Sequence, residues 1–105
     1  MRFIETPIFT KAIEKLLTTE EFLALQAALL ARPNLGPVIP GTVGLRKMRW
    51  ARAGSGKRGG IRVIYYWDLM TDTFYLLYVY PKSARDDLTA AQLRTLSHLV
   101  HEEFQ

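Results

Sequence analysis

Apolar and polar residues alternate along two stretches of this chain, and the alternation predicts two β-strands. In residues 45–52 (LRKMRWAR), basic residues alternate with apolar ones, and residues 61–67 (IRVIYYW) are rich in β-branched and aromatic side chains. Because side chains of a strand point alternately to opposite faces, Lys47 and Arg49 should share one face. The short glycine-containing segment between the two stretches predicts that the strands form a hairpin.

Helical spacing of apolar residues, preceded by helix-start signals, predicts two helices near the N-terminus. Thr6 followed by Pro7 is typical of a helix start, with Thr as the N-cap and Pro at the first helical position. Thr18 and Glu21 have the spacing of a capping box for a second helix. This helix should end at Ala31, because a proline follows shortly after it.

Three further segments complete the predicted order of elements. Residues 2–5 form a short candidate strand. Residues 74–80 (FYLLYVY) are nearly all apolar or aromatic, as expected of a central strand covered on both faces. A capping box between Thr89 and Gln92 predicts a C-terminal helix. The order β-α-α-β-β-β-α predicts an α+β fold, with the helices against one side of a mainly antiparallel sheet.

Length and composition favour a single globular domain spanning residues 1–105. Of the 105 residues, 49% are hydrophobic and 23% are charged, which is ordinary for such a domain. The chain has no cysteine, which removes disulfides, thiol catalysis and cysteine-based zinc sites. We see neither a signal peptide nor an apolar run of membrane-spanning length, so we expect a cytoplasmic protein with no membrane partner.

Charge is distributed unevenly along the chain. The formal net charge is +4, yet residues 22–67 carry eight Lys and Arg and no acid. The rest of the chain carries six Lys and Arg and all ten Asp and Glu. Such segregation creates a local positive field that favours anionic partners. Because the cations stand at strand spacing among aromatic residues, we interpret them as a surface for a polyanion rather than a solvated basic loop.

Two familiar kinds of site do not fit this sequence. The segment 53–60 (AGSGKRGG) has Ala51 where a phosphate-binding loop needs Gly, and Arg58 where it needs Ser or Thr. His98 and His101 lie three residues apart on the predicted last helix, but no third metal ligand is placed beside them. We therefore expect no nucleotide site, no metal site and no cofactor.

A cationic sheet face lined with aromatic residues is suited to cleavage of the RNA backbone. The ribose 2′-OH is the nucleophile, so the protein must align it, stabilise the developing phosphorane charge and move two protons. Arg and Lys supply the charge, and a Tyr or a Lys can carry protons. The candidate residues on this face are Lys47, Arg49, Arg62, Tyr80 and Lys82, flanked by Arg46, Arg52, Lys57 and Arg58. Tyr80 fits a core position as well as a site position.

Two long segments, 45–67 (LRKMRWARAGSGKRGGIRVIYYW) and 74–92 (FYLLYVYPKSARDDLTAAQ), resemble the RelE/HigB-like toxins of bacterial type II toxin–antitoxin systems. The HigB-type branch is the nearest, and the likeness covers nearly the whole chain. It implies the RelE fold and ribosome-dependent cleavage of messenger RNA at the A site of the 70S ribosome. It also implies a neutralising antitoxin, often with a helix-turn-helix domain, through which alone the toxin would reach operator DNA.

The resemblance also assigns roles to individual residues. It places the basic positions before the loop at Lys47 and Arg49, and the stabiliser of the transition state at Arg62. It places the functional strand end at Tyr80 and Lys82. The late catalytic Tyr of the RelE prototype has no counterpart here, so the general base stays open between these two, with Arg85 as a weaker candidate. The residues expected to hold ribosomal RNA are Arg46, Arg52, Lys57, Arg58 and Arg85.

Two other functions stay open at this stage. The ParE branch has the same fold and blocks a topoisomerase without RNA chemistry, although it does not need Lys47, Arg62 and Tyr80 together. A non-catalytic RNA-binding module would instead show uniform, salt-sensitive affinity, with many small contributions from Lys and Arg and no single essential residue.

Overall fold

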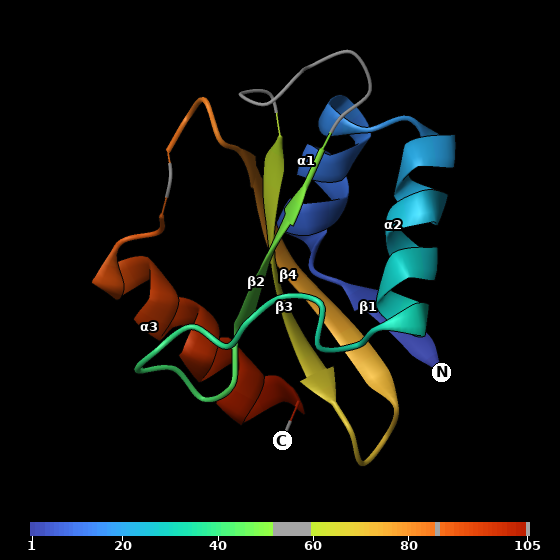
Figure 1. Cartoon of the computed structure of the whole chain (residues 1–105). Helices are drawn as coiled ribbons and strands as arrows, with labels where there is room; N and C mark the ends of the chain where they lie inside the picture. Colours follow the sequence, from blue (N-terminus) through green and yellow to red (C-terminus); the bar gives the residue numbers. More distant parts are fainter. Residues whose placement is uncertain (52–59, 86, 105) are drawn as a thin grey trace.

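The computed structural model of this chain describes residues 1–51, 60–85 and 87–104. All predicted strands and helices are present, in the predicted order (Figure 1). They are β1 (Arg2–Glu5), α1 (Pro7–Leu16), α2 (Thr19–Ala31), β2 (Arg46–Trp50), β3 (Ile61–Asp68), β4 (Thr73–Pro81), α3 (Ala90–Leu99) and a final π-helical turn, η1 (Val100–Phe104). The α+β prediction is therefore confirmed.

The strands form one mixed sheet in the order β1-β4-β3-β2. β2 and β4 both pair with β3 in antiparallel fashion, which confirms the hairpin of β2 and β3, and β1 joins β4 in parallel. The sheet is thus mainly antiparallel, as predicted. β4 is an interior strand with apolar side chains on both faces, also as predicted. The predicted hairpin tip, residues 52–59, lies outside the described residues.

Side-chain caps fix the helix starts where the sequence predicts them. The Thr6 hydroxyl accepts a hydrogen bond from the Phe9 N–H at 3.1 Å. Complete capping boxes join Thr18 to Glu21 and Thr89 to Gln92. These caps satisfy backbone N–H groups that the first helical turn leaves without partners, so a local sequence signal is enough to place each start.

The two N-terminal helices cover one face of the sheet. Phe9 and Ile13 of α1 and Leu25 and Leu29 of α2 are buried. They pack in one apolar core with sheet residues that include Met48, Ile61, Val63, Tyr65, Phe74, Leu76 and Val79. This core supports the β2–β3 hairpin on the face of the sheet that α1 and α2 cover.

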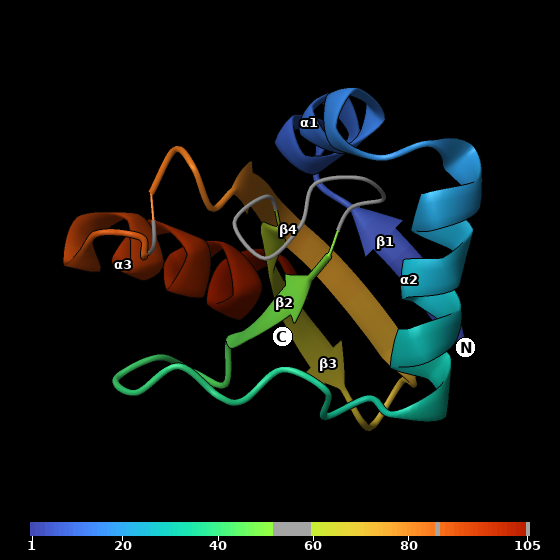
Figure 2. The same cartoon turned by 45° about the horizontal axis from the view of Figure 1, so that its top comes forward.

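The C-terminal helix α3 covers the opposite face of the sheet, as Figure 2 shows. The expectation that all helices lie against one side is therefore wrong. Ile64 of β3 and Leu77 of β4 form a second core with Leu88 and Val100, which flank α3. Because the central strands are apolar on both faces, each face needs its own helical cover.

A β-bulge in β4 decides which face Tyr80 joins. The register of β3 against β4 shifts between Ile64 and Tyr65, where Leu77 is an extra residue in β4. Beyond the bulge, Val79 packs in the α1–α2 core and Tyr80 packs in the α3 core. The bulge thus turns Tyr80 to the α3 face.

The link between α2 and β2 is tied to the sheet through a buried tyrosine. The Tyr65 hydroxyl donates to the Pro33 carbonyl at 2.8 Å and accepts from the Gly36 N–H at 2.9 Å. Burial raises the pKa of this hydroxyl, which keeps the donated proton in place. Gly36 approaches the strand so closely that an added Cβ would lie 2.8 Å from the carbonyl carbon of Lys47. The link therefore supports the backbone of β2.

Candidate anion-binding site

A pocket of about 280 Å³ on the α3 face of the sheet is lined, among the described residues, by four cations and one acid. β2 contributes Lys47 and Arg49, β3 contributes Arg62, and Lys82 follows β4. The acid is Asp87, two residues before the cap of α3. The predicted shared face of Lys47 and Arg49 is confirmed, and the structure brings four of the five predicted catalytic residues into one pocket.

Arg62 lies deepest among these cations. Its side chain is buried, with 7% of the residue exposed, and Nη1 donates to the Ile61 carbonyl at 3.3 Å. Among the described residues, no carboxylate lies within ion-pair distance of Arg62. A guanidinium has five N–H donors, so several of them stay available to an anion that enters the pocket.

The carboxylate of Asp87 forms an ion pair with Lys47 across the pocket. The hydrogen bond from Lys47 lowers the pKa of Asp87, and the charges of Lys47, Arg49 and Arg62 lower it further. The positive field of the cluster therefore reaches the carboxylate. Sequence reasoning missed Asp87, because its partner Lys47 lies 40 residues away in the chain and no local signal links the two.

Tyr80 lies beside the cation cluster and belongs mainly to the core. It is 4% exposed, and its ring centroid lies 5.9 Å from that of Tyr78. Tyr80 also borders an adjoining pocket of about 250 Å³ that Lys47 and Asp87 share. The backbone N–H of Lys82 donates to the Gly60 carbonyl at 2.9 Å, which ties the end of β4 to the start of β3. Tyr80 thus occupies a core position that borders the adjoining pocket, and its role in the site stays a prediction.

Not all the predicted flanking cations join this pocket. Nη1 of Arg46 donates to the Gly36 carbonyl at 2.8 Å. Nη1 of Arg85 donates to Gln92 Oε1 at 2.7 Å, and Arg85 borders a different pocket near α1. The other three predicted RNA-binding cations, Arg52, Lys57 and Arg58, lie outside the described residues.

The two histidines lie near a larger, separate pocket. This pocket of about 550 Å³ runs between residues 40–43 and α3, and its lining includes His98 and His101. Nδ1 of His98 lies 3.6 Å from Glu102 Oε1 in an exposed pair. Within the described ranges, no three His, Cys, Asp or Glu residues are grouped as metal ligands. We place the candidate site in the smaller pocket, because the cations converge there.

The chain matches a known protein family over its whole length. Residues 1–105 match the family model described as the RelE toxin of the RelE / RelB toxin-antitoxin system. This match confirms the resemblance to RelE toxins, while the assignment to the HigB-type branch stays a prediction. No helix in the described part of the chain is long and apolar enough to cross a membrane.

Proposed function

This chain belongs to the RelE toxin family of toxin–antitoxin systems, and on that premise we propose that it is a ribosome-dependent endoribonuclease that cuts messenger RNA at the A site. The observation that carries the proposal is the convergence of Lys47, Arg49, Arg62 and Lys82 on one pocket. The pocket suits a phosphodiester, which is an anion with several oxygen acceptors.

Arg62 is the proposed stabiliser of the transition state. Attack of the 2′-oxygen on phosphorus adds negative charge to the phosphate oxygens. A buried guanidinium held by strand β3 meets this charge without first reorganising, and such preorganised stabilisation is usually the largest single contribution to catalysis. Removal of such a donor typically slows the chemical step by about 10²–10³-fold.

Lys47 and Arg49 are the proposed orienting residues for the phosphate. They project from alternate positions of β2, which is an edge strand of the sheet. Their cationic groups therefore meet the RNA backbone from the side opposite the end of β4. Holding the phosphate between two strands favours the in-line geometry that the reaction needs.

We assign the two proton transfers to Lys82 and Tyr80. One proton leaves the 2′-OH as it attacks, and one reaches the departing 5′-oxygen. Lys82 lines the pocket, and Tyr80 borders the adjoining one. The general base stays open between Lys82, which lines the pocket of the scissile phosphate, and Tyr80 beside it.

Family membership brings an antitoxin as the partner of this toxin. We propose that this antitoxin has a helix-turn-helix domain and that the complex reaches operator DNA through that domain. We also propose that the ribosome is held by the cations outside the pocket, at Arg46, Arg52, Lys57, Arg58 and Arg85, and that the toxin acts in the cytoplasm.

Primer extension on a defined messenger RNA with purified 70S ribosomes tests this function. The wild type should cut inside A-site codons, and only when ribosomes are present. Arg62→Ala should lose about 10²-fold or more of this cutting. Arg32→Ala is the matched control, because it removes the same charge from the exposed end of α2. It should cut like the wild type.

Other outcomes would contradict the proposal. Equal cutting by Arg62→Ala and the wild type would remove Arg62 from the mechanism. Cutting of free RNA would remove the dependence on the ribosome. Growth arrest by a wild-type toxin that cuts no RNA would favour the topoisomerase-blocking or plain RNA-binding alternative.

A further inference from the structure

Among the described residues that line the cationic pocket, Asp87 is the one acid. Its carboxylate reaches Lys47, which is 40 residues away in the chain. The Asp87 side chain is 72% exposed and that of Lys47 is 23% exposed. An exposed ion pair contributes little to the stability of a fold, so a contribution to stability does not explain the place of Asp87.

The position of the carboxylate is set by the residues that follow it. Leu88 is buried in the α3 core, and Thr89 caps α3. The backbone at Asp87 is thereby anchored beside the pocket, while its side chain stays free to turn toward water. The anchored residues Leu88 and Thr89 therefore keep the Asp87 carboxylate at the edge of the pocket.

The carboxylate and a phosphodiester make the same demands on this pocket. Each is a single negative charge with oxygen acceptors, and each is attracted by Lys47, Arg49 and Arg62. The Asp87 carboxylate and the phosphodiester cannot accept the same N–H of the Lys47 ammonium group at the same time. A tethered anion also acts at an effective concentration of roughly millimolar, which disfavours small free anions.

We propose that Asp87 is a resident counter-ion that holds Lys47 in the free protein, and that the RNA phosphate displaces it when substrate binds. This inference rests on the proposed function, because it takes RNA as the ligand of the pocket. A polyanion contacts several cations at once, so its binding free energy offsets the loss of one ion pair. An isolated phosphate or sulfate ion makes too few contacts to offset that loss. Asp87 is therefore a specificity-determining residue that favours extended anions.

Equilibrium binding of RNA tests the exchange without any need for cleavage. The probe is a short fluorescein-labelled single-stranded RNA with 2′-O-methyl riboses, which cannot be cut, and the readout is fluorescence anisotropy. Asp87→Asn should bind about fivefold more tightly than the wild type, the factor expected for one unit charge at about 4 Å in water.

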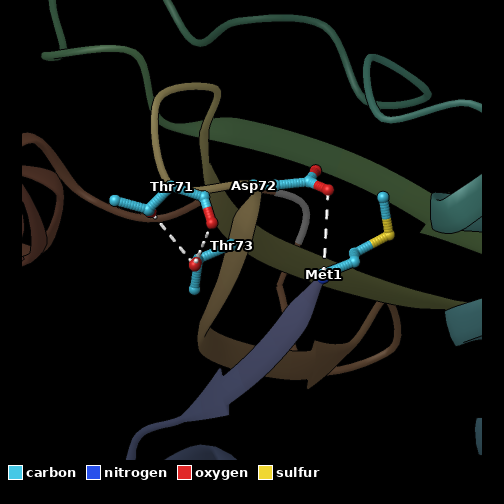
Figure 3. A network of polar contacts seen from close by, with 4 residues as sticks. All are labelled: Met1, Thr71, Asp72 and Thr73. Carbon is cyan, nitrogen blue, oxygen red and sulfur yellow. Dashed lines mark hydrogen bonds and ion pairs between the residues drawn. The ribbon is translucent and has the colours of Figure 1, made fainter.

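Asp72→Asn is the matched control. Asp72 lies in the β3–β4 turn, at the far end of these strands from Arg62, and pairs with the N-terminus of Met1 at 3.9 Å (Figure 3). The substitution removes the same charge, and Asn tolerates the positive φ of 51° at this position. Its affinity for the probe should stay within about twofold of the wild-type value, since the lost charge is screened at this range.

A double substitution ties the effect to Lys47. In a Lys47→Ala background, Asp87→Asn should bring no gain beyond that of Asp72→Asn, because the donor for which both anions compete is absent. Closely similar thermal midpoints for the Asp87→Asn and wild-type proteins would show that the fold is intact. Weaker binding by Asp87→Asn, or a gain equal to that of Asp72→Asn, would overturn the proposal.

The outcomes separate this inference from the proposed function. Tighter binding by Asp87→Asn, together with no cutting on ribosomes, would keep the exchange and reject the nuclease. Cutting on ribosomes, together with unchanged binding by Asp87→Asn, would keep the nuclease and reject the exchange. No binding of the probe by any of the proteins would also reject the exchange.

Discussion

Arg49 on β2 lies directly opposite Arg62 on β3 in the antiparallel register of the hairpin. Two cations at facing positions repel each other and destabilise a sheet. Lys47 and Lys82 add to the same pocket, and Asp87 supplies one compensating charge. Residues that reduce stability are often found at functional sites, and the facing pair of Arg49 and Arg62 is consistent with a functional site here.

Replacing Arg49 should raise the free energy of unfolding of the protein. Arg49→Thr removes the facing charge and introduces a β-branched residue, so the free energy of unfolding should rise by about 0.5 kcal/mol. Urea unfolding measures this change. Arg2→Thr is the control, because Arg2 faces Thr73 rather than a cation. A stabilisation that is equal in both variants, or one that persists unchanged in 1 M salt, would contradict the explanation by charge repulsion.

Removing the hydroxyl of Tyr65 should destabilise the protein. Tyr65→Phe leaves the Pro33 carbonyl and the Gly36 N–H without this partner, which costs about 1–3 kcal/mol of unfolding free energy. Tyr78→Phe deletes the same atom from a partly exposed ring and should cost less than about 0.5 kcal/mol. Chemical denaturation of both variants compares the two costs. Similar values would mean that the Tyr65 bridge does not anchor the link.

The pKa of Asp87 should lie below the usual range of an aspartate and should depend on Lys47. Lys47→Ala removes the largest cause of the shift, so the pKa of Asp87 should rise toward its ordinary value. Carbon-detected NMR titration of the carboxyl group measures the change. Lys11→Ala, which removes an equal charge from α1, should leave the titration where it is.

The same shift gives stability a small pH dependence, since the ion pair is exposed. Because folding lowers the pKa of Asp87, its ion pair stabilises the fold above the unfolded-state pKa. That contribution is lost as the pH falls through the lower, folded-state pKa. The Asp87→Asn protein should therefore lose less stability than the wild type over this acidic range. An identical acid dependence in both proteins would contradict the role of the ion pair.

Local signals in the sequence determined the elements and part of the site. Caps at Thr6, Thr18 and Thr89 placed the helix starts, because each cap satisfies donors only three residues away. Alternation placed Lys47 and Arg49 on one face, because the strand itself imposes that period. These interactions lie within a few residues, and so they can be read from sequence alone.

Only the tertiary structure decided which side chains from distant parts of the chain come into contact on the sheet. The bulge at Leu77 turned Tyr80 to the α3 face, and the docking of α3 onto that face brought Asp87 to Lys47. Arg46 turned instead to the carbonyl of Gly36. These contacts join residues far apart in the chain, and they depend on how two apolar cores pack on opposite faces of one sheet. No local periodicity carries that information.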